Sequence, residues 1–271
     1  MSLEPRDVSV DPTRLADLAL EVAVSAADLV RHRRAEGFGQ ETKSTATDIV
    51  TDVDRASDEH LRDRLSRHRP DDGWVTEESG EFEGATDISW VVDPIDGTTN
   101  FVYGHPPYAV SIAACVAGRP VAAAIVEIAR DERYRAALGG GASRDGIELT
   151  ARRAVPPELA LVGTGFAYDP ARRTRQATML THLISRVRDI RRLGAAAYDL
   201  TSVASGRLDA YVEAGLQPWD LAAGWLICTE SGVVVESIHE VGPPDSDVLA
   251  APAGLVGPLR ELLAEAGARD V

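Results

Sequence analysis

The chain has 271 residues and a formal net charge of −15, so it can bury a large core without disulfides, and its charge disfavours general binding to nucleic acids or anionic membranes. Its two cysteines, Cys115 and Cys228, lie in apolar runs outside any C-x-x-C pair, as buried thiols of a reducing cytoplasm do. The polar stretch 1–14 and the lack of a long apolar run disfavour a signal peptide or a membrane-spanning helix, so we expect a cytoplasmic protein.

The N-terminal half begins with two predicted helices and continues as strands. Asp11-Pro12 is a capping pair that starts a helix, and Gly37 ends it. A second helix is predicted from about residue 53 to residue 68. Turn signals then separate predicted strands near residues 74–76, 88–93, 108–116, 121–129, 133–137 and 147–151.

The C-terminal half alternates strands with helices. The stretch 152–157 is predicted to be a domain boundary, which divides the chain into residues 1–153 and 154–271. Strands are predicted at 159–166, 190–193, 208–213, 233–238 and 248–251. Helices are predicted at 171–187, 195–204, 221–230 and 255–266. This alternation favours a sheet covered by helices.

The stretch WVVDPIDGTTNF, residues 90–101, places two carboxylates at the end of an apolar run. Acidic side chains are rarely buried without a partner, and Pro94 should turn Asp96 back toward Asp93. Two carboxylates held so close require that one is protonated or that a cation lies between them. The N–H groups of residues 97–99, at a possible helix start, would bind an anion. Carboxylates beside an anion site suggest divalent cations that bridge to phosphate.

Three further acidic clusters accompany this stretch: DIVTDVD (48–54), TEES (76–79) and WDLAAG (219–224). Read singly, each has a structural explanation as helix caps or a solvated loop, for Asp48, Thr51, Asp52, Glu77-Glu78 and Asp220. The clusters contain no histidine or cysteine, so a shared site would offer only oxygen ligands. Such a site suits Mg²⁺, Mn²⁺ or Ca²⁺ and disfavours zinc. Two such ions about 3.5–4 Å apart can clamp the oxygens of a phosphoryl displacement.

These four motifs, in this order and with this spacing, resemble those of the inositol monophosphatase family, whose lithium-sensitive phosphatases are related to fructose-1,6-bisphosphatase. LDAYVEAGLQPWD (208–220) extends the resemblance toward the substrate region. The resemblance implies an α+β fold, a layered αβαβα sandwich, and a homodimer.

The resemblance also implies a role for each matching position. The first Mg²⁺ would be held by Glu78, Asp93 and the carbonyl of Ile95, and the second by Asp93, Asp96 and Asp220. Glu78 would also contact a third, more hydrated ion. The attacking water would be oriented by Asp54 and Thr98. The phosphate would contact the backbone of Gly97 and Thr98, and the polyol would contact Gly194, Ala195, Ala196 and Glu213.

The expected reaction is Mg²⁺-dependent hydrolysis of myo-inositol phosphate by a metal-activated water, with Mn²⁺ as a possible substitute and no covalent phosphoenzyme. Substrate specificity depends on the shape of the site, so three sibling substrates remain as alternatives: fructose 1,6-bisphosphate, histidinol phosphate and 3′-phosphoadenosine 5′-phosphate. Arg191 and Arg192 would offer basic contacts to such substrates, or serve a solvated or structural role. A non-catalytic binding protein with the same fold is a further alternative, which the intact set of acidic residues disfavours.

Overall fold

The computed structural model describes residues 11–43 and 49–268. The helices are α1 (Pro12–Glu36), α2 (Asp52–His68), α3 (Thr98–Tyr103), α4 (Pro170–Leu183), α5 (Ala196–Ala204), α6 (Pro218–Glu230) and α7 (Ala253–Glu265), with a 3₁₀ turn η1 (Pro157–Leu159). None of the helices in these described ranges is both long enough and apolar enough to cross a bilayer.

The strands form two main sheets and a small hairpin. The large sheet has the order β10 (Ile147–Glu148), β9 (Gly141–Arg144), β8 (Glu132–Ala137), β7 (Arg119–Glu127), β6 (Ala109–Val116), β5 (Ile88–Asp96), β3 (Gly73–Thr76), β4 (Gly80–Phe82). It is antiparallel except between β3 and β5. The small sheet has the order β12 (Asp189–Arg191), β11 (Leu161–Thr164), β13 (Ala210–Ala214), β15 (Asp247–Ala251), β14 (Val234–Ser237). The hairpin pairs β1 (Gln40–Thr42) with β2 (Ile49–Thr51).

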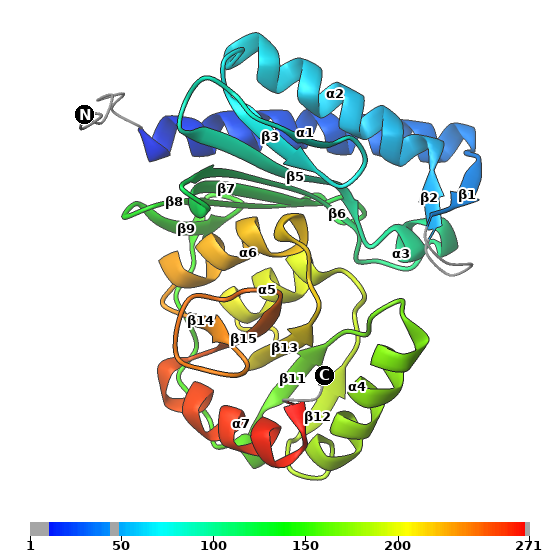
Figure 1. Cartoon of the computed structure of the whole chain (residues 1–271). Helices are drawn as coiled ribbons and strands as arrows, with labels where there is room; N and C mark the ends of the chain where they lie inside the picture. Colours follow the sequence, from blue (N-terminus) through cyan, green and yellow to red (C-terminus); the bar gives the residue numbers. More distant parts are fainter. Residues whose placement is uncertain (1–10, 44–48, 269–271) are drawn as a thin grey trace, which may run out of the picture.

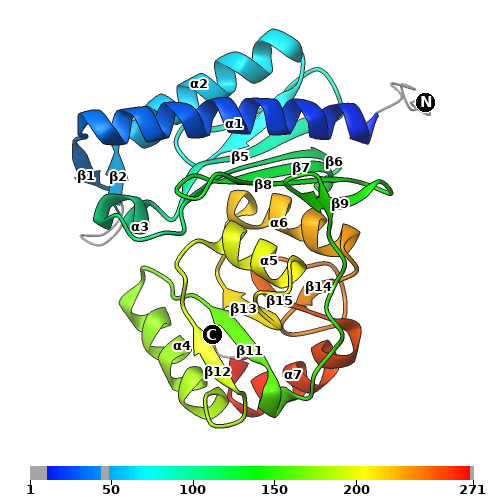
Figure 2. The same ribbon diagram turned by 180° about the vertical axis from the view of Figure 1, so that it is seen from behind.

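These elements stack in five layers, which confirms the predicted αβαβα sandwich. Helices α1 and α2 cover the outer face of the large sheet, and α5 and α6 lie between the two sheets. Helices α4 and α7 lie beyond the small sheet, as the front and back views agree (Figures 1 and 2). Both faces of the large sheet are therefore covered, so its central strands read as continuous apolar runs.

Strand β5 illustrates this double burial. Trp90 and Val92 pack with the core under α1 and α2, whereas Val91 packs with the core under α5 and α6. Trp90 is 1% exposed, and its indole N–H donates to Asp72 across 2.9 Å. The core between the sheets includes residues from both halves of the chain, and the division at residues 153/154 stays a prediction.

The predicted elements differ from the observed ones mainly at short, exposed strands. Strands β1 and β4 are exposed along their whole length, so they lack the alternation that predicts a strand. The strand predicted at 147–151 is reduced to the two residues of β10. Strand β5 continues through Pro94 to Asp96, three residues beyond the prediction.

Candidate active site

Strand β5 brings Asp93 and Asp96 to one buried point. Pro94 has no N–H to donate, and the pairing of β5 with β6 shifts register between Asp93 and Asp96. This bulge breaks the alternation that would otherwise send residues three apart to opposite faces. Asp93 and Asp96 are 2% and 5% exposed. The predicted convergence of the two carboxylates is therefore present, and a bulge produces it.

Asp96 also fixes the start of α5. Its carboxylate accepts hydrogen bonds from the backbone N–H groups of Ala196 (3.0 Å), Ala197 (2.9 Å) and Tyr198 (3.4 Å). Ala195, at the N-cap position of α5, has no side chain that could serve these donors. A strand of the large sheet thus caps a helix a hundred residues later, and the cap orients the Asp96 carboxylate.

Asp220 completes the acidic group from α6. Helix α6 begins at Pro218, so Gln217 is the N-cap and Asp220 lies in the first turn; the prediction that Asp220 is the cap itself was wrong. Its Oδ2 accepts from the backbone N–H of Gln217 across 2.7 Å. Asp93, Asp96 and Asp220 each offer a carboxylate oxygen, and these oxygens lie within 4.8 Å of one another.

The electrostatics of this trio favour a bound cation. Burial raises the pKa of Asp93 and of Asp220 well above the usual range, and the neighbouring acids add to this rise. Burial raises the pKa of Asp96 to about 7, although the three N–H donors of α5 oppose the shift. Two buried carboxylates and a partly buried third, this close together, are costly without a counter-charge. A hard divalent cation would remove that cost, and an all-carboxylate set fits Mg²⁺, Mn²⁺ or Ca²⁺.

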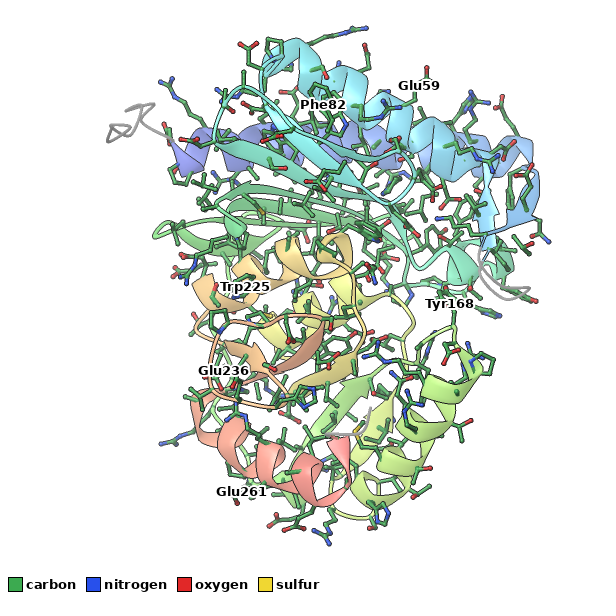
Figure 3. The ribbon with its side chains drawn as sticks, in the orientation of Figure 1. Glu59, Phe82, Tyr168, Trp225, Glu236 and Glu261 are labelled. Carbon is green, nitrogen blue, oxygen red and sulfur yellow. The ribbon has the colours of Figure 1, made fainter. Side chains whose placement is uncertain are left out.

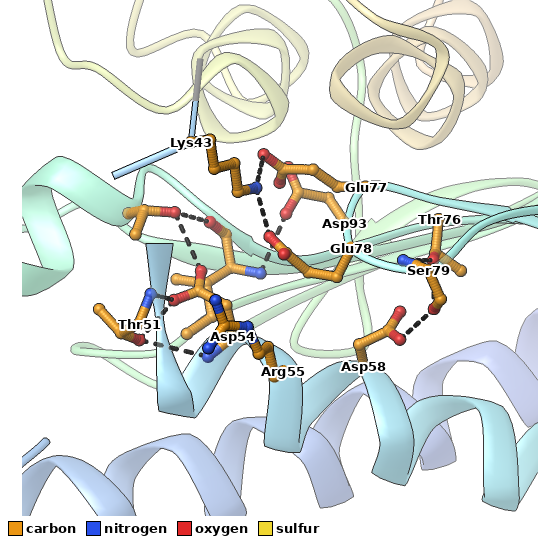
Figure 4. Close-up of polar contacts among 12 residues, drawn as sticks. Lys43, Thr51, Asp54, Arg55, Asp58, Thr76, Glu77, Glu78, Ser79 and Asp93 are labelled. Atoms are coloured by element: carbon orange, nitrogen blue, oxygen red, sulfur yellow. Dashed lines mark hydrogen bonds and ion pairs between the residues drawn. The ribbon is translucent and has the colours of Figure 1, made fainter. Parts of the chain in front are cut away.

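Asp54 and Thr98 form a second hydrogen-bonded unit, and Figure 4 shows Asp54 beside Thr51 at the start of α2. Thr51 is the N-cap of α2, and Asp54 closes the capping box by accepting from the Thr51 N–H across 2.8 Å. The other Asp54 oxygen accepts from the Thr98 hydroxyl across 3.0 Å. Of the predicted caps, Thr51 is confirmed, Asp52 instead accepts from the backbone of Gly39, and Asp48 lies outside the described residues. Burial raises the pKa of Asp54.

The second motif places Glu77, not Glu78, on the wall of the cavity. Lys43 pairs with both carboxylates, at 2.8 Å from Glu77 (Figure 4). The charge of Glu77 contributes to the raised pKa of Asp93 and of Asp220. Glu78, to which the resemblance assigned the first ion, pairs with Lys43 and is not among the residues that line the cavity, so its role as a metal ligand stays a prediction. Lys43 was missed by the sequence reasoning, since a single lysine in a polar stretch carries no signal of its own.

The cavity that these residues line has a volume of about 400 Å³. It contains every predicted site residue except Asp54, which reaches it through Thr98, and Glu78. Gly97 has a φ of 85°, and a Cβ there would lie 3.0 Å from that of Ala195, so only glycine fits this turn easily. Glu213 accepts a hydrogen bond from the Tyr211 hydroxyl at the other end of the cavity, and burial raises the pKa of Glu213.

The arrangement can bind a phosphate ester through cations and hold its alcohol near a hydrogen-bond acceptor. The carboxylates offer oxygen ligands for a metal ion, Gly97 and Thr98 line the cavity beside them, and the Glu213 carboxylate can accept hydrogen bonds from hydroxyls. Arg192, Phe166 and Tyr168 also line the cavity, and the sequence had suggested only the first of them.

Comparison with known proteins agrees with this geometry. A family model described as "Inositol monophosphatase family" matches residues 11–270. A Mycobacterium leprae protein named inositol-1-monophosphatase is 44% identical over 273 residues, covering 92% of this chain and 93% of that protein. An Escherichia coli K12 protein named Nus factor SuhB is 36% identical, with coverage of 82% and 84%. The solved structure of Mycobacterium tuberculosis SuhB aligns with a TM-score of 0.81 at 43% identity, covering 94% of this chain and 98% of that one.

Proposed function

The chain belongs to the inositol monophosphatase family and is a phosphomonoester hydrolase; on this premise we propose that it hydrolyses myo-inositol 1-phosphate to myo-inositol and phosphate with Mg²⁺ as cofactor. The observation that carries the proposal is the trio of carboxylates, two buried and one partly buried, whose oxygens lie within 4.8 Å of one another in a cavity that Gly97 and Thr98 also line. The mycobacterial relative's name supports inositol phosphate as the substrate.

We propose the metal ligands that the resemblance implies, except that Glu77 takes the place of Glu78. Glu77, Asp93 and the carbonyl of Ile95 would hold a first ion, and Asp93, Asp96 and Asp220 a second. Glu77 replaces Glu78 because Glu77 lines the cavity and interacts electrostatically with Asp93 and Asp220. Glu78 would instead help to hold Lys43 in place.

Divalent cations bound there would lower the pKa of a water ligand and screen the charge of the phosphate. Thr98 would contact that water, because its hydroxyl donates to Asp54 and its oxygen lone pairs remain free to accept. Asp54 does not line the cavity, so it would act indirectly, by accepting the hydrogen bond that orients the Thr98 hydroxyl. The backbone of Gly97 and Thr98 would bind the phosphate oxygens.

The alcohol portion of the substrate would lie between α5 and β13. Ala195 and Ala196 have small side chains that leave room for a ring, and Glu213 would accept hydrogen bonds from its hydroxyls. Gly194 belongs to the same wall. No side chain would bond covalently to phosphorus, and the water would attack directly.

A phosphate-release panel tests this function. Purified protein is assayed with inositol 1-phosphate, fructose 1,6-bisphosphate, histidinol phosphate and 3′-phosphoadenosine 5′-phosphate, with and without Mg²⁺. The proposal expects Mg²⁺-dependent release from inositol 1-phosphate. If phosphate is released only from another compound of the panel, that compound is the substrate instead of inositol 1-phosphate. If phosphate is released from none of the four compounds, the proposal is refuted.

We further propose that Mn²⁺ substitutes for Mg²⁺, that lithium inhibits, and that the protein is a cytoplasmic homodimer. The two free, buried cysteines support a reducing compartment. Light scattering at micromolar concentration tests the dimer, and a mass equal to one chain would contradict it.

The name of the E. coli relative, a Nus factor, provides a second candidate function in assembly with other macromolecules. The net charge of −15 disfavours RNA as the direct partner. An RNA pull-down beside the phosphate assay separates the two functions, because a binding protein that has lost catalysis would retain RNA or a partner and release no phosphate.

A further inference from the structure

Two segments that are distant in the sequence meet at the cavity that holds the acidic trio. The phosphate segment, residues 96–100, runs from the end of β5 into α3, and the alcohol segment, residues 193–196, leads from β12 into α5. Residues of both segments line the cavity. Tyr168, which also lines it, is labelled in Figure 3 on the same side of the molecule as α3. The relative position of the two segments therefore sets the shape of the cavity.

The side-chain amide of Asn100 joins the two segments. Its Nδ2 donates to the carbonyl of Leu193 across 2.7 Å and to the carbonyl of Pro107 across 2.7 Å. A primary amide nitrogen carries two hydrogens, so these two bonds use its whole donor capacity. The amide also lies against Gly194, where a Cβ would come within 3.2 Å of both of its terminal atoms. Asn100 thus links α3, the loop before β6 and the alcohol segment.

The backbone of Asn100 is itself held in place. Its carbonyl accepts from the N–H of His105 across 2.9 Å, just beyond the end of α3. The next residue, Phe101, is fully buried and packs against the rings of Phe38 and Tyr108, with centroids 4.9 and 5.5 Å away. The side chain of Asn100 therefore extends from a fixed point, and its hydrogen bonds can fix the segments to which they are made.

The far end of the alcohol segment is held by the same stretch of chain. Asp96 accepts from the N–H of Ala196 across 3.0 Å. Between the two hydrogen-bonded ends, the segments are in direct contact, because a Cβ on Gly97 would lie 3.0 Å from the Cβ of Ala195. Residues 193–195 belong to no helix or strand, so side-chain hydrogen bonds from the phosphate segment take the place of a backbone ladder.

We propose that Asn100 is a positioning residue that sets the alcohol segment at a fixed distance from the phosphate segment. The inference rests on the proposed function, because it gives Asn100 a part in recognition of the alcohol. Asn100 does not line the cavity, so it acts through Leu193 and not by contact with the substrate. Its loss would release the alcohol segment at one end and leave the turn at Gly97 in place. Affinity for the alcohol should fall, and affinity for phosphate should not.

Asn100→Ala tests this role through two constants that separate the halves of the substrate. The first is the KM for inositol 1-phosphate, and the second is the inhibition constant of inorganic phosphate, which lacks the alcohol. We expect the KM to rise about tenfold, in the range expected for the loss of one or two hydrogen bonds. The inhibition constant of phosphate should change less than about threefold, since the phosphate segment keeps its own contacts.

Tyr103→Ala is the matched control, because Tyr103 lies on the same helix, is 70% exposed and does not line the cavity. It should leave both constants unchanged. Asn100→Ser, whose hydroxyl can donate to one carbonyl only, should raise the KM by a smaller factor, and it replaces Asn100→Ala if that variant does not fold.

Two kinetic outcomes would overturn the inference while leaving the proposed function intact. One is a KM within threefold of the wild-type value in a folded Asn100 variant. The other is an inhibition constant of phosphate that rises as much as the KM, because the phosphate segment would then have moved as well. Absence of phosphate release by the wild type would refute the proposed function and the inference with it.

Asn100 is the only asparagine of the chain, which allows a direct test of the link without any substitution. Wild-type protein labelled with ¹⁵N in the asparagine side-chain amide gives one NH₂ signal in a proton–nitrogen NMR spectrum. We expect both amide protons to lie downfield of those of free asparagine and to exchange slowly with solvent, because both are hydrogen-bonded. Shifts and exchange rates like those of free asparagine would overturn the inference and would not bear on the proposed function.

Discussion

The two adjacent glutamates of the second motif allow a sharp test of which carboxylate binds metal. Glu77 lines the cavity and pairs with Lys43 across 2.8 Å, whereas Glu78 pairs with Lys43 and lines no part of the cavity. Glu77→Gln and Glu78→Gln each remove one charge, change no volume, and differ by one position. Any difference between them therefore reports the direction in which each side chain points.

The expected magnitudes are well separated. Residues that only support a metal ligand cost about 10- to 100-fold in affinity when replaced, so loss of a direct ligand should cost at least ~100-fold, or about 2.7 kcal/mol. Glu78→Gln removes one partner of Lys43, which keeps its contact with Glu77. Partly exposed ion pairs contribute about 0–1 kcal/mol, so Mg²⁺ affinity should change by about fivefold or less.

The assay is titration calorimetry with Mg²⁺ at pH 8, above the pKa of about 7 of Asp96, together with the Mg²⁺ dependence of phosphate release. Thermal melts confirm that both variants fold. Equal losses in the two variants would show that both carboxylates act on the metal. A larger loss in Glu78→Gln would refute the orientation on which the proposed ligand set rests.

Three other predictions follow from the same geometry. If Thr98 positions the attacking water as proposed, Thr98→Ala should lower kcat about 10- to 100-fold while the half-saturating Mg²⁺ concentration changes less than about threefold. Steady-state kinetics at several Mg²⁺ concentrations measure both, and a raised Mg²⁺ requirement with an unchanged kcat would contradict the role. Gly165→Ala would introduce a Cβ that overlaps the Glu213 carboxylate, so KM for inositol 1-phosphate should rise about tenfold, and an unchanged KM would remove Glu213 from the substrate site. The pKa of Asp96 is raised from 3.8 to about 7, so the metal-free folded state binds more protons than the unfolded chain between these values, and its stability should fall as the pH rises from about 4 to about 7. Melts with excess Mg²⁺ should reverse that loss, and a metal-free melting temperature that rises over this range would contradict the shift.

The sequence predicted the parts of the site in which a single stretch carries the signal. The apolar run before Asp93 predicted a buried strand, and the pair Asp93 and Asp96 predicted a cation site, because buried acids require compensation. The layered fold was also predicted correctly, since resemblance covered most of the chain. The buried strand and the cation site were predicted from the pattern of one short stretch, and the fold was predicted from several motifs taken together.

Two kinds of feature were not predicted: contacts between residues far apart in the sequence, and the direction in which each of two adjacent side chains points. The cap that Asp96 forms on α5 joins positions a hundred residues apart, and no local pattern marks it. Glu77 and Glu78 follow β3 in a turn, where strand alternation no longer determines which side chain faces inward. Lys43 and the short exposed strand β1 lie in a polar stretch without periodicity.

The most direct test of the account is phosphate release from inositol 1-phosphate as Mg²⁺ is titrated, with the wild type beside Asp93→Asn. Asp93 is shared by both proposed ions, and asparagine keeps its size while it removes the charge. We predict saturable Mg²⁺-dependent turnover in the wild type and none above background in the folded variant. Near-wild-type turnover in Asp93→Asn, or release that does not depend on Mg²⁺, would contradict the proposal that buried carboxylates act through bound cations.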